Sequence, residues 1–280
     1  MGYNNFMLKS PDGQLFYREW TCVSPKAVLL LVHGMGGYSG RFFEMGPYFA
    51  KAGFQVYAIE QQGHGEHPTP RGHISNFKLY TADLRSMVSF AKSKNPGKKV
   101  FIFGESMGGL ITLDFTIHQQ KMIDGVILMS PALKDKLGMS LGKKASIFYS
   151  SIFDPMRLYG SDFDAGMFTR DKVMAKRIDS DPLEVRKFTA KFYLAILKAM
   201  TYVGMRPRRI KIPVLMILGG KDLMIDAVTG GKYFGRIGAK VKTLKWYPEM
   251  YHALYVDKDR DKVFREMAEW LNERLKEAGK

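Results

Sequence analysis

The 280-residue chain has a single cysteine, Cys22, and therefore cannot form a disulfide within itself. One cysteine also excludes a cysteine-rich zinc site, because such sites need several thiolate ligands. Chains that need no disulfides are typical of reducing compartments, so we expect a cytoplasmic protein.

Long apolar runs are also missing from the sequence. No window approaches the roughly 18 consecutive apolar residues that a membrane-spanning helix needs. Residues 1–6 lack the basic segment and the following apolar run of a secretory signal. We therefore expect a soluble protein. Its formal net charge of +16 would favour peripheral contact with an anionic membrane surface.

The positive charge is scattered, without the compact basic run and interleaved aromatic residues of a nucleic-acid-binding protein, so we expect no nucleic-acid partner. His64, His67 and His73 lie at short spacing, which could suggest metal ligands. His64 stands between two glycines, however, and this is more typical of a structural turn. We expect no metal and no cofactor, and the sequence gives no indication of an oligomeric state.

The sequence does contain an alternation of short apolar runs with helix-like stretches, which is typical of a parallel sheet covered by helices. The runs that predict strands are 27–32, 54–59, 99–103, 126–129, 214–218 and 241–247. The stretches that predict helices are 41–52, 79–94, 107–118 and 259–276. At the front, 6–8 and 15–20 flank a Ser-Pro-Asp-Gly turn and predict an antiparallel hairpin. The result is an α/β protein with eight strands.

This alternation stops between Pro131 and Arg206, where no strand-like run appears and the sequence becomes helical. We therefore predict an inserted helical cap at 132–206 between two parts of the α/β core, 1–131 and 207–280. The clearest helix of the cap is predicted to begin after Pro182. It would carry one apolar stripe. The members of this stripe are Phe188, Phe192, Ile196, Met200 and Val203.

Residues 104–108 read Gly-Glu-Ser-Met-Gly, a G-x-S-x-G pattern between the predicted strand 99–103 and a helix-like run. A sharp strand-to-helix turn at this place would lift the hydroxyl of Ser106 above the sheet and set it at a helix N-terminus. The context favours a nucleophilic serine over a structural glycine-rich turn.

A serine hydroxyl needs an imidazole to accept its proton, and the imidazole needs an acid to orient it. His252 is the histidine that lies downstream of Ser106 in a loop after a predicted strand. Asp222 follows the strand 214–218 and is the predicted acid, with Asp226 as the competing candidate. Asp226 could equally cap the next helix.

A second glycine-rich loop, Gly34-Met35-Gly36-Gly37, directly follows the strand 27–32. Loops at this position supply one of the two backbone N–H groups that stabilise an oxyanion. We expect the donors to be the backbone N–H groups of Met35 and Met107. The alternative is a glycine-rich turn that is only structural.

Together these motifs resemble the monoacylglycerol lipase and lysophospholipase branch of the α/β-hydrolases. The resemblance rests on His-Gly-Met-Gly-Gly at 33–37, Gly-His-Gly at 63–65, Gly-Glu-Ser-Met-Gly-Gly at 104–109 and the loops of Asp222 and His252, and it covers nearly the whole chain. It implies the α/β-hydrolase fold: an eight-stranded, mostly parallel sheet flanked by helices, with an inserted helical cap over an acyl-binding tunnel.

Two further segments, 72–77 and 178–183, also resemble this branch. Three residues depart from its pattern: Glu60 stands where Asp is usual, Gln62 where Arg is frequent, and Glu105 where His frequently precedes the serine. None of them is a predicted triad residue. They bear on the hydrogen bonds behind the active site and so on the substrate.

The resemblance implies a serine carboxylic-ester hydrolase that releases a fatty acid from a monoacylglycerol or a lysophospholipid through an acyl-enzyme on Ser106. The apolar cap would suit an acyl chain, with Phe188, Phe192, Ile196 and Met200 as candidate contacts. A stripe at helical spacing is more often helix core than a ligand site. The alternatives are a small-ester carboxylesterase or peptidase on the same fold, and a non-catalytic lipid-binding protein.

Overall fold

A computed structural model describes residues 4–10, 13–136, 139–161 and 163–276. Its main sheet has eight strands in the order β1-β2-β4-β3-β5-β6-β9-β10. The strands are β1 (Asn4–Ser10), β2 (Gly13–Trp20), β3 (Ala27–Val32), β4 (Phe54–Glu60), β5 (Val100–Glu105), β6 (Gly125–Met129), β9 (Val214–Gly219) and β10 (Lys242–Tyr247). The predicted eight-stranded sheet is confirmed.

The sheet is parallel from β4 to β10, and the β1-β2 hairpin joins it antiparallel through β2. Every residue of β3, β4, β5, β6 and β9 is buried. Strands covered on both faces are built from continuous apolar runs, and this explains why these segments could be recognised in the sequence.

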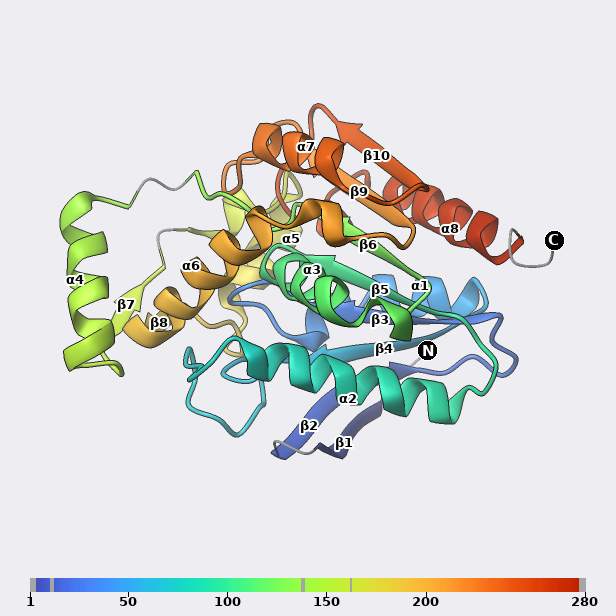
Figure 1. Cartoon of the computed structure of the whole chain (residues 1–280), viewed down its shortest axis with the longest axis horizontal. Coiled ribbons are helices and arrows are strands. Elements are labelled where there is room, and N and C mark those ends of the chain that lie inside the picture. Colours follow the sequence, from blue (N-terminus) through green and yellow to red (C-terminus); the bar gives the residue numbers. More distant parts are fainter. Residues whose placement is uncertain (1–3, 11–12, 137–138, 162, 277–280) are drawn as a thin grey trace.

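Helices cover both faces of the sheet (Figure 1). One face carries α1 (Met45–Lys51) and α8 (Arg260–Lys276), and the other carries α2 (Lys78–Lys94), α3 (Met107–Gln119) and α7 (Ala227–Arg236). The described residues also form five short 3-10 turns: η1 (Ser39–Phe42), η2 (Gln120–Met122), η3 (Ala165–Met167), η4 (Pro207–Arg209) and η5 (Leu254–Val256). The described part of the chain contains no helix that is long and apolar enough to cross a membrane.

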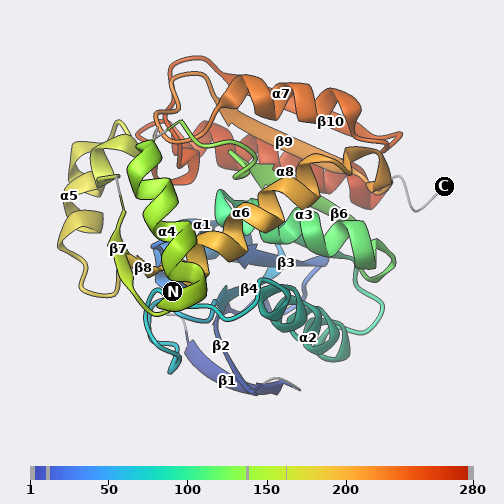
Figure 2. The same ribbon diagram turned by 60° about the vertical axis from the view of Figure 1, so that its left-hand side comes forward.

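The segment between β6 and β9 lies beyond the carboxyl ends of the parallel strands (Figures 1 and 2). It contains α4 (Leu141–Phe153), β7 (Leu158–Gly160), α5 (Lys172–Ser180), β8 (Lys187–Thr189) and α6 (Ala190–Gly204). The prediction that it holds no strand is wrong, because β7 and β8 form a two-stranded antiparallel sheet. Strands of three residues are too short to show an alternating pattern.

The predicted start of the cap helix is also wrong. The α6 helix begins at Ala190, where the side chain of Thr189 accepts a hydrogen bond from the backbone N–H of Phe192. Phe188 therefore lies in β8 and not on the helix. A Thr at this position is a strong N-cap, so it ends the strand and starts the helix.

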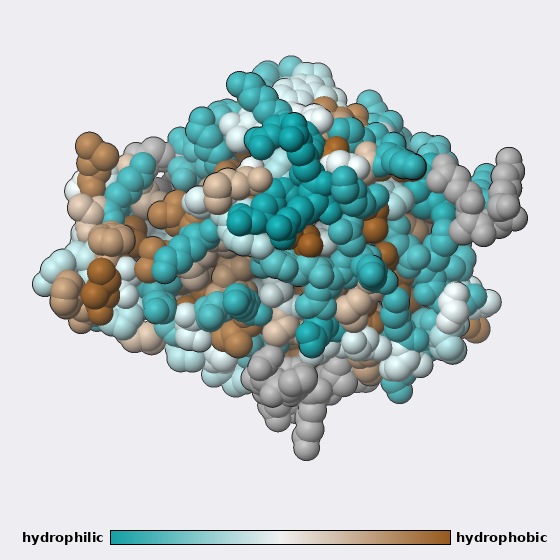
Figure 3. All heavy atoms as spheres, viewed as in Figure 1, coloured by the Kyte–Doolittle hydropathy of each residue, from teal (hydrophilic) through white to brown (hydrophobic). Residues whose placement is uncertain are grey.

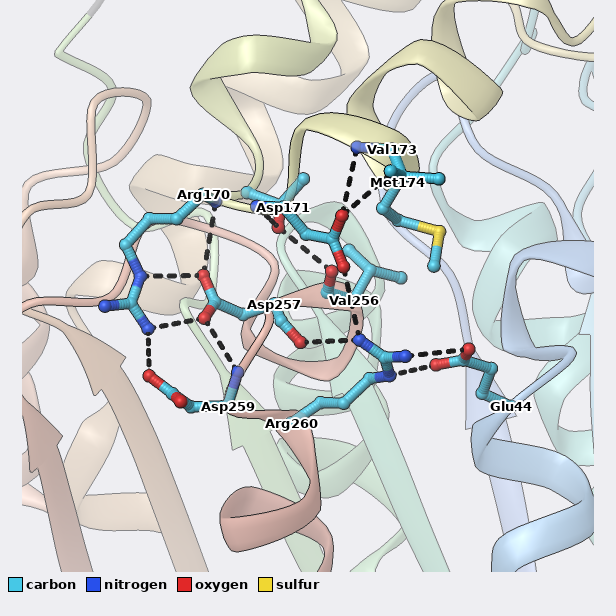
Figure 4. A network of polar contacts seen from close by, with 10 residues as sticks. Glu44, Arg170, Asp171, Val173, Met174, Val256, Asp257, Asp259 and Arg260 are labelled. Carbon is cyan, nitrogen blue, oxygen red and sulfur yellow. Dashed lines mark hydrogen bonds and ion pairs between the residues drawn. The ribbon is translucent and has the colours of Figure 1, made fainter.

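A network of charged residues ties this segment to the core (Figure 4). Arg170 donates to both oxygens of Asp257, at 3.1 and 2.5 Å, and to Asp259 at 2.6 Å. Arg260 joins Asp171 to Glu44, which precedes α1. Because Asp257 lies shortly after the predicted base, the network fixes this part of the cap against the loop that carries the base.

Candidate active site

Ser106 lies between β5 and α3 with φ 53° and ψ −116°. A positive φ is strained for any residue with a β-carbon and is usually kept only where function requires it. Here it turns the chain sharply from the strand into the helix. The serine is thus held at the helix N-terminus, at the carboxyl end of the central strands.

The two flanking glycines are explained by close backbone contacts. A β-carbon on Gly108 would lie 2.1 Å from the carbonyl oxygen of Val32, and one on Gly104 would lie 2.5 Å from that of Gly108. Any side chain at either position would push the α3 helix away from β3 and β5. The sharp turn therefore depends on both glycines.

His252 and Asp222 come from the loops after β10 and β9, and both side chains are buried. Nδ1 of His252 lies 2.8 Å from Oδ2 of Asp222. The other oxygen of Asp222 accepts the backbone N–H groups of Met224 and Ile225, at 2.8 and 2.9 Å. The carboxylate is therefore held on both sides and oriented toward the imidazole.

The protonation of this pair follows from its contacts. Burial alone would lower the pKa of His252, but attraction and hydrogen bonding to the Asp222 carboxylate raise it above its usual value. Burial opposes ionisation of Asp222 in turn, yet the imidazole of His252 and two backbone N–H groups lower the pKa of that carboxyl. The pair thus favours a charged acid beside a proton-accepting imidazole.

Asp226 occupies a different position, at the N-terminus of α7. Its side chain accepts the backbone N–H groups of Val228 and Thr229 and pairs with Lys134 at 3.0 Å. These contacts lower the pKa of Asp226 to about 2, with the Lys134 bond as the main cause. The structure therefore places Asp222, and not Asp226, against His252.

Nε2 of His252 is buried and has no hydrogen-bond partner among the described residues. Glu105 lies beside it, with Oε1 at 3.5 Å. Among the described residues, the hydroxyl of Ser106 likewise donates no hydrogen bond to Nε2 of His252. Such bonds are often long before substrate binds and shorten in the complex.

A cavity of about 360 Å³ opens onto Ser106. Met35 and Met107 line it beside the serine, and this brings together the two residues predicted to supply oxyanion N–H groups. The remaining lining is mostly apolar and comes from α4, α6 and the loop after β9. These residues include Ile147, Phe148, Ile196, Leu197, Met200, Met224 and Ile225.

The predicted apolar stripe is divided by the structure. Ile196 and Met200 line the cavity, whereas Phe188 and Phe192 do not. The two phenyl rings stack on each other at 4.5 Å, and both pack against His64 at about 6 Å. Phe188 and Phe192 are fully buried core residues and lie outside the lining of this cavity. The difference arises because the stripe is only partly helical and its first members face the α/β core.

The three departures from the family pattern also have defined places. Glu60 accepts the backbone N–H and the hydroxyl of Ser39. Gln62 donates to Asp83 at 2.9 Å, which ties the loop after β4 to α2. These two residues hold loops in place, and Glu105 is the departure that contacts His252.

Sequence reasoning missed the residues that surround His252 from the cap side. The ring of Phe168 lies edge-on to the imidazole at 6.0 Å. Its carbonyl accepts the backbone N–H of Ala253 at 2.8 Å. Arg41 and Glu184 form a buried ion pair next to them. Only Glu184, directly after the segment 178–183, lay near a recognisable motif.

Comparison with known proteins extends over most of the chain. A family described as serine aminopeptidase, S33, has a model that matches residues 23–259. Human monoglyceride lipase is 28% identical over 278 residues, 97% of this chain and 91% of that protein. A phospholipase of Bacillus subtilis (strain 168) is 26% identical over 249 residues, 88% of this chain and 95% of that protein. The crystal structure of Paleococcus ferrophilus monoacylglycerol lipase superposes with a TM-score of 0.83 and 26% identity, covering 98% of this chain and 100% of that one.

Proposed function

The chain belongs to the serine aminopeptidase S33 family of α/β-hydrolases, and we propose that within this family it hydrolyses monoacylglycerols through an acyl-enzyme on Ser106. The protein is a serine ester hydrolase, as its monoglyceride lipase and phospholipase relatives indicate. The proposal adds which residues perform the reaction and which ester is cleaved.

In the proposed reaction, Nε2 of His252 accepts the hydroxyl proton of Ser106 as the oxygen attacks the ester carbonyl. The imidazolium then gives this proton to the departing glycerol oxygen. Water repeats the sequence on the acyl-enzyme and releases the fatty acid. Asp222 holds the imidazole by the 2.8 Å contact at Nδ1 and stabilises the charge that the ring carries in both steps.

The negative charge on the carbonyl oxygen needs donors that are in place before the reaction. The backbone N–H groups of Met35 and Met107 are the proposed donors, since both residues border the cavity beside Ser106. The N-terminus of α3 adds its dipole. Loss of one such donor typically raises the barrier by ~2.7–4 kcal/mol.

The observation that carries the ester assignment is the apolar cavity in front of Ser106. Among the described residues, the charged groups in its lining are Lys144 of α4 and Asp135 of the segment that precedes α4. An acyl chain fits such a lining, because thioether and aliphatic side chains adapt to it and exclude water. A peptide substrate would leave its polar groups without partners there.

We also propose that the cap contacts anionic membrane surfaces while it takes up substrate. The same helix that lines the cavity with Ile147 and Phe148 turns other apolar side chains to solvent: Tyr149, Ile152 and Phe153 are 57–68% exposed. Figure 3 shows hydrophobic side chains gathered at this end of the molecule. The net charge of +16 would add electrostatic attraction.

The proposal is tested by labelling and by a substrate panel. A fluorophosphonate probe should react with Ser106, and Ser106→Ala should abolish labelling and lower kcat by on the order of 10⁶-fold with folding intact. Monoacylglycerols, lysophospholipids, short-chain esters and peptides are then compared by kcat/KM. A preference for lysophospholipids would move the assignment to that substrate, and hydrolysis of peptides alone would reject the ester assignment.

A further inference from the structure

Glu105 lies at the end of β5, directly before Ser106, and its side chain is completely buried. Neither of its carboxyl oxygens has a partner at hydrogen-bonding geometry among the described residues, although the backbone N–H of Gly34 faces the carboxylate and lowers its pKa. Burying a carboxylate without hydrogen bonds is costly, so such a group in a native protein requires an explanation. The proposed reaction gives Glu105 no role.

Nε2 of His252, which has no hydrogen-bond partner among the described residues, lies 3.5 Å from Oε1 of Glu105. The other carboxyl oxygen lies directly on the loop after β3, where a β-carbon on Gly34 would come within 2.3 Å of it. The carboxylate of Glu105 therefore lies between this loop and the imidazole of His252. It approaches the ring at the nitrogen opposite to the one that contacts Asp222.

Other charged and titratable groups face Glu105 from three further elements. They are Arg41 of η1, Tyr255 of η5 and Glu184 of the cap. Arg41 is paired with Glu184 through two of its three nitrogens, because Nε donates to one carboxylate oxygen at 2.6 Å and Nη2 donates to the other, while Nη1 has no hydrogen-bond partner among the described residues. With the guanidinium neutralised by Glu184, His252 remains as the group that can balance the charge of Glu105.

Resting on the function proposed above, we propose that Glu105 is a positioning residue that faces Nε2 of His252 and stabilises the imidazolium form of the ring. Glu105 and His252 hold one proton between them. While this proton is on Nε2 and directed at Glu105, the ring cannot accept the proton of Ser106. When Nε2 loses this proton to solvent, its lone pair becomes free to accept the proton of the Ser106 hydroxyl.

The electrostatic environment agrees with this arrangement. Burial raises the pKa of Glu105, while the neighbouring His252 and Arg41 oppose the rise. For His252, burial lowers the pKa and the Asp222 and Glu105 carboxylates raise it, with a net rise above 6.5. Because the base acts only when neutral, this rise moves the acid limb of activity to higher pH.

The test is the pH profile of Glu105→Gln, which keeps the size of the side chain and removes the charge. The acid limb of kcat/KM for a short-chain chromogenic ester should move to lower pH by about one unit, since a neutral amide stabilises the imidazolium less. The fluorophosphonate labelling rate should show the same shift. The plateau kcat should fall by roughly 10-fold, because the imidazolium also forms in each acyl-transfer step.

Glu249→Gln is the matched control. Glu249 is an exposed acid in the loop that leads to His252, and its ion pair with Lys221 lies in solvent. The same change of charge there should leave the acid limb unmoved. A parental acid limb for Glu105→Gln at unchanged melting temperature would overturn the proposal, as would a shift to higher pH.

If Glu105→Gln does not fold, the proposal for Glu105 and His252 can still be tested on the unmodified protein. Nitrogen NMR of the histidine rings, with His252→Asn to identify the signals, should show at pH 6.5, the usual pKa of a histidine, that most His252 rings are protonated on both nitrogens, because the pKa of His252 is raised. A ring with a single proton down to that pH contradicts the proposal. A parental protein that neither cleaves esters nor reacts with fluorophosphonate would instead refute the proposed function.

Discussion

Nδ1 of His252 and Oδ2 of Asp222 lie 2.8 Å apart, although 30 residues separate them in the sequence. The contact selects one of two acids in the same loop, because Asp226 is bound to the N-terminus of α7. Asp222→Asn should therefore lower kcat by roughly 10⁴-fold through the wrong imidazole tautomer. Steady-state kinetics on a monoacylglycerol and a short ester measure this loss.

Asp226→Asn is the matched control for that substitution. It should keep kcat within about threefold and change the free energy of unfolding by less than about 1 kcal/mol, because Asn is an equally good N-cap and only the surface ion pair with Lys134 is lost. The reverse ranking of the two variants would assign the acid to Asp226.

Much of the fold and of the proposed triad could be predicted from the sequence, because short local patterns of residues indicate both. The buried strands are continuous apolar runs, and Ser106 and Asp222 each follow one of them, while His252 follows the partly exposed edge strand β10. In a parallel sheet the carboxyl ends of strands meet at one edge, so three positions far apart in sequence could be placed together.

The cap and the surroundings of His252 could not be predicted in the same way. The strand that contains Phe188 is only three residues long, and the N-cap Thr189 makes the helix begin later than the apolar stripe predicts. The contact between Glu105 and His252 joins residues 147 positions apart, and no local pattern specifies it. Contacts of this kind depend on how loops pack in three dimensions.

Glu60 makes a prediction for stability against pH. Burial raises the pKa of Glu60 to about 7, against hydrogen bonds from Ser39 that lower it. The folded state therefore keeps a proton that the unfolded state loses near 4.5, and the contribution of Glu60 to stability is lost as pH rises from 4.5 through 7. Glu60→Gln has no proton to lose. Its free energy of unfolding relative to the parent should rise by up to about 3 kcal/mol between pH 4.5 and 8.

Urea denaturation of both proteins at several pH values measures this difference. Glu269→Gln, at an exposed position of α8, provides the comparison and should change the free energy of unfolding by less than about 0.5 kcal/mol at every pH. A constant difference between Glu60→Gln and the parent across this range would show that Glu60 does not titrate there.

The exposed apolar side chains of α4 are predicted to contribute to binding of a lipid surface. Replacing Tyr149, Ile152 and Phe153 together by Ser should weaken binding to vesicles of phosphatidylcholine and phosphatidylserine by at least about 10-fold. A loss of only about 1.4 kcal/mol of binding free energy from the three side chains gives that factor. Cosedimentation measures the bound fraction. Val23 and Val173 are as exposed but lie away from the cavity, so replacing them by Ser should leave binding unchanged. Equal losses in both variants would place the contact elsewhere.

The division of the apolar stripe predicts which cap residues set chain-length preference. Ile196 and Met200 line the cavity, so replacing both by Ser should flatten the rise of kcat/KM with acyl-chain length. In an intact apolar cavity each methylene taken out of water contributes ~0.8 kcal/mol, about a fourfold gain, until the cavity is filled. Short esters of a chromogenic phenol should be cleaved nearly as before.

Phe192 provides the contrast, because it belongs to the same helix and is fully buried against Phe188 and His64. Phe192→Ala should lower the free energy of unfolding by roughly 3–5 kcal/mol, the usual cost of such a truncation, while the folded fraction keeps the parental dependence on chain length. Melting temperature and kcat/KM for esters of increasing length, measured on both variants, separate the two roles. If Phe192→Ala flattened the chain-length dependence and the Ile196 and Met200 double variant did not, the acyl chain would lie on the Phe192 side of α6, and the cavity in front of Ser106 would not be its binding site.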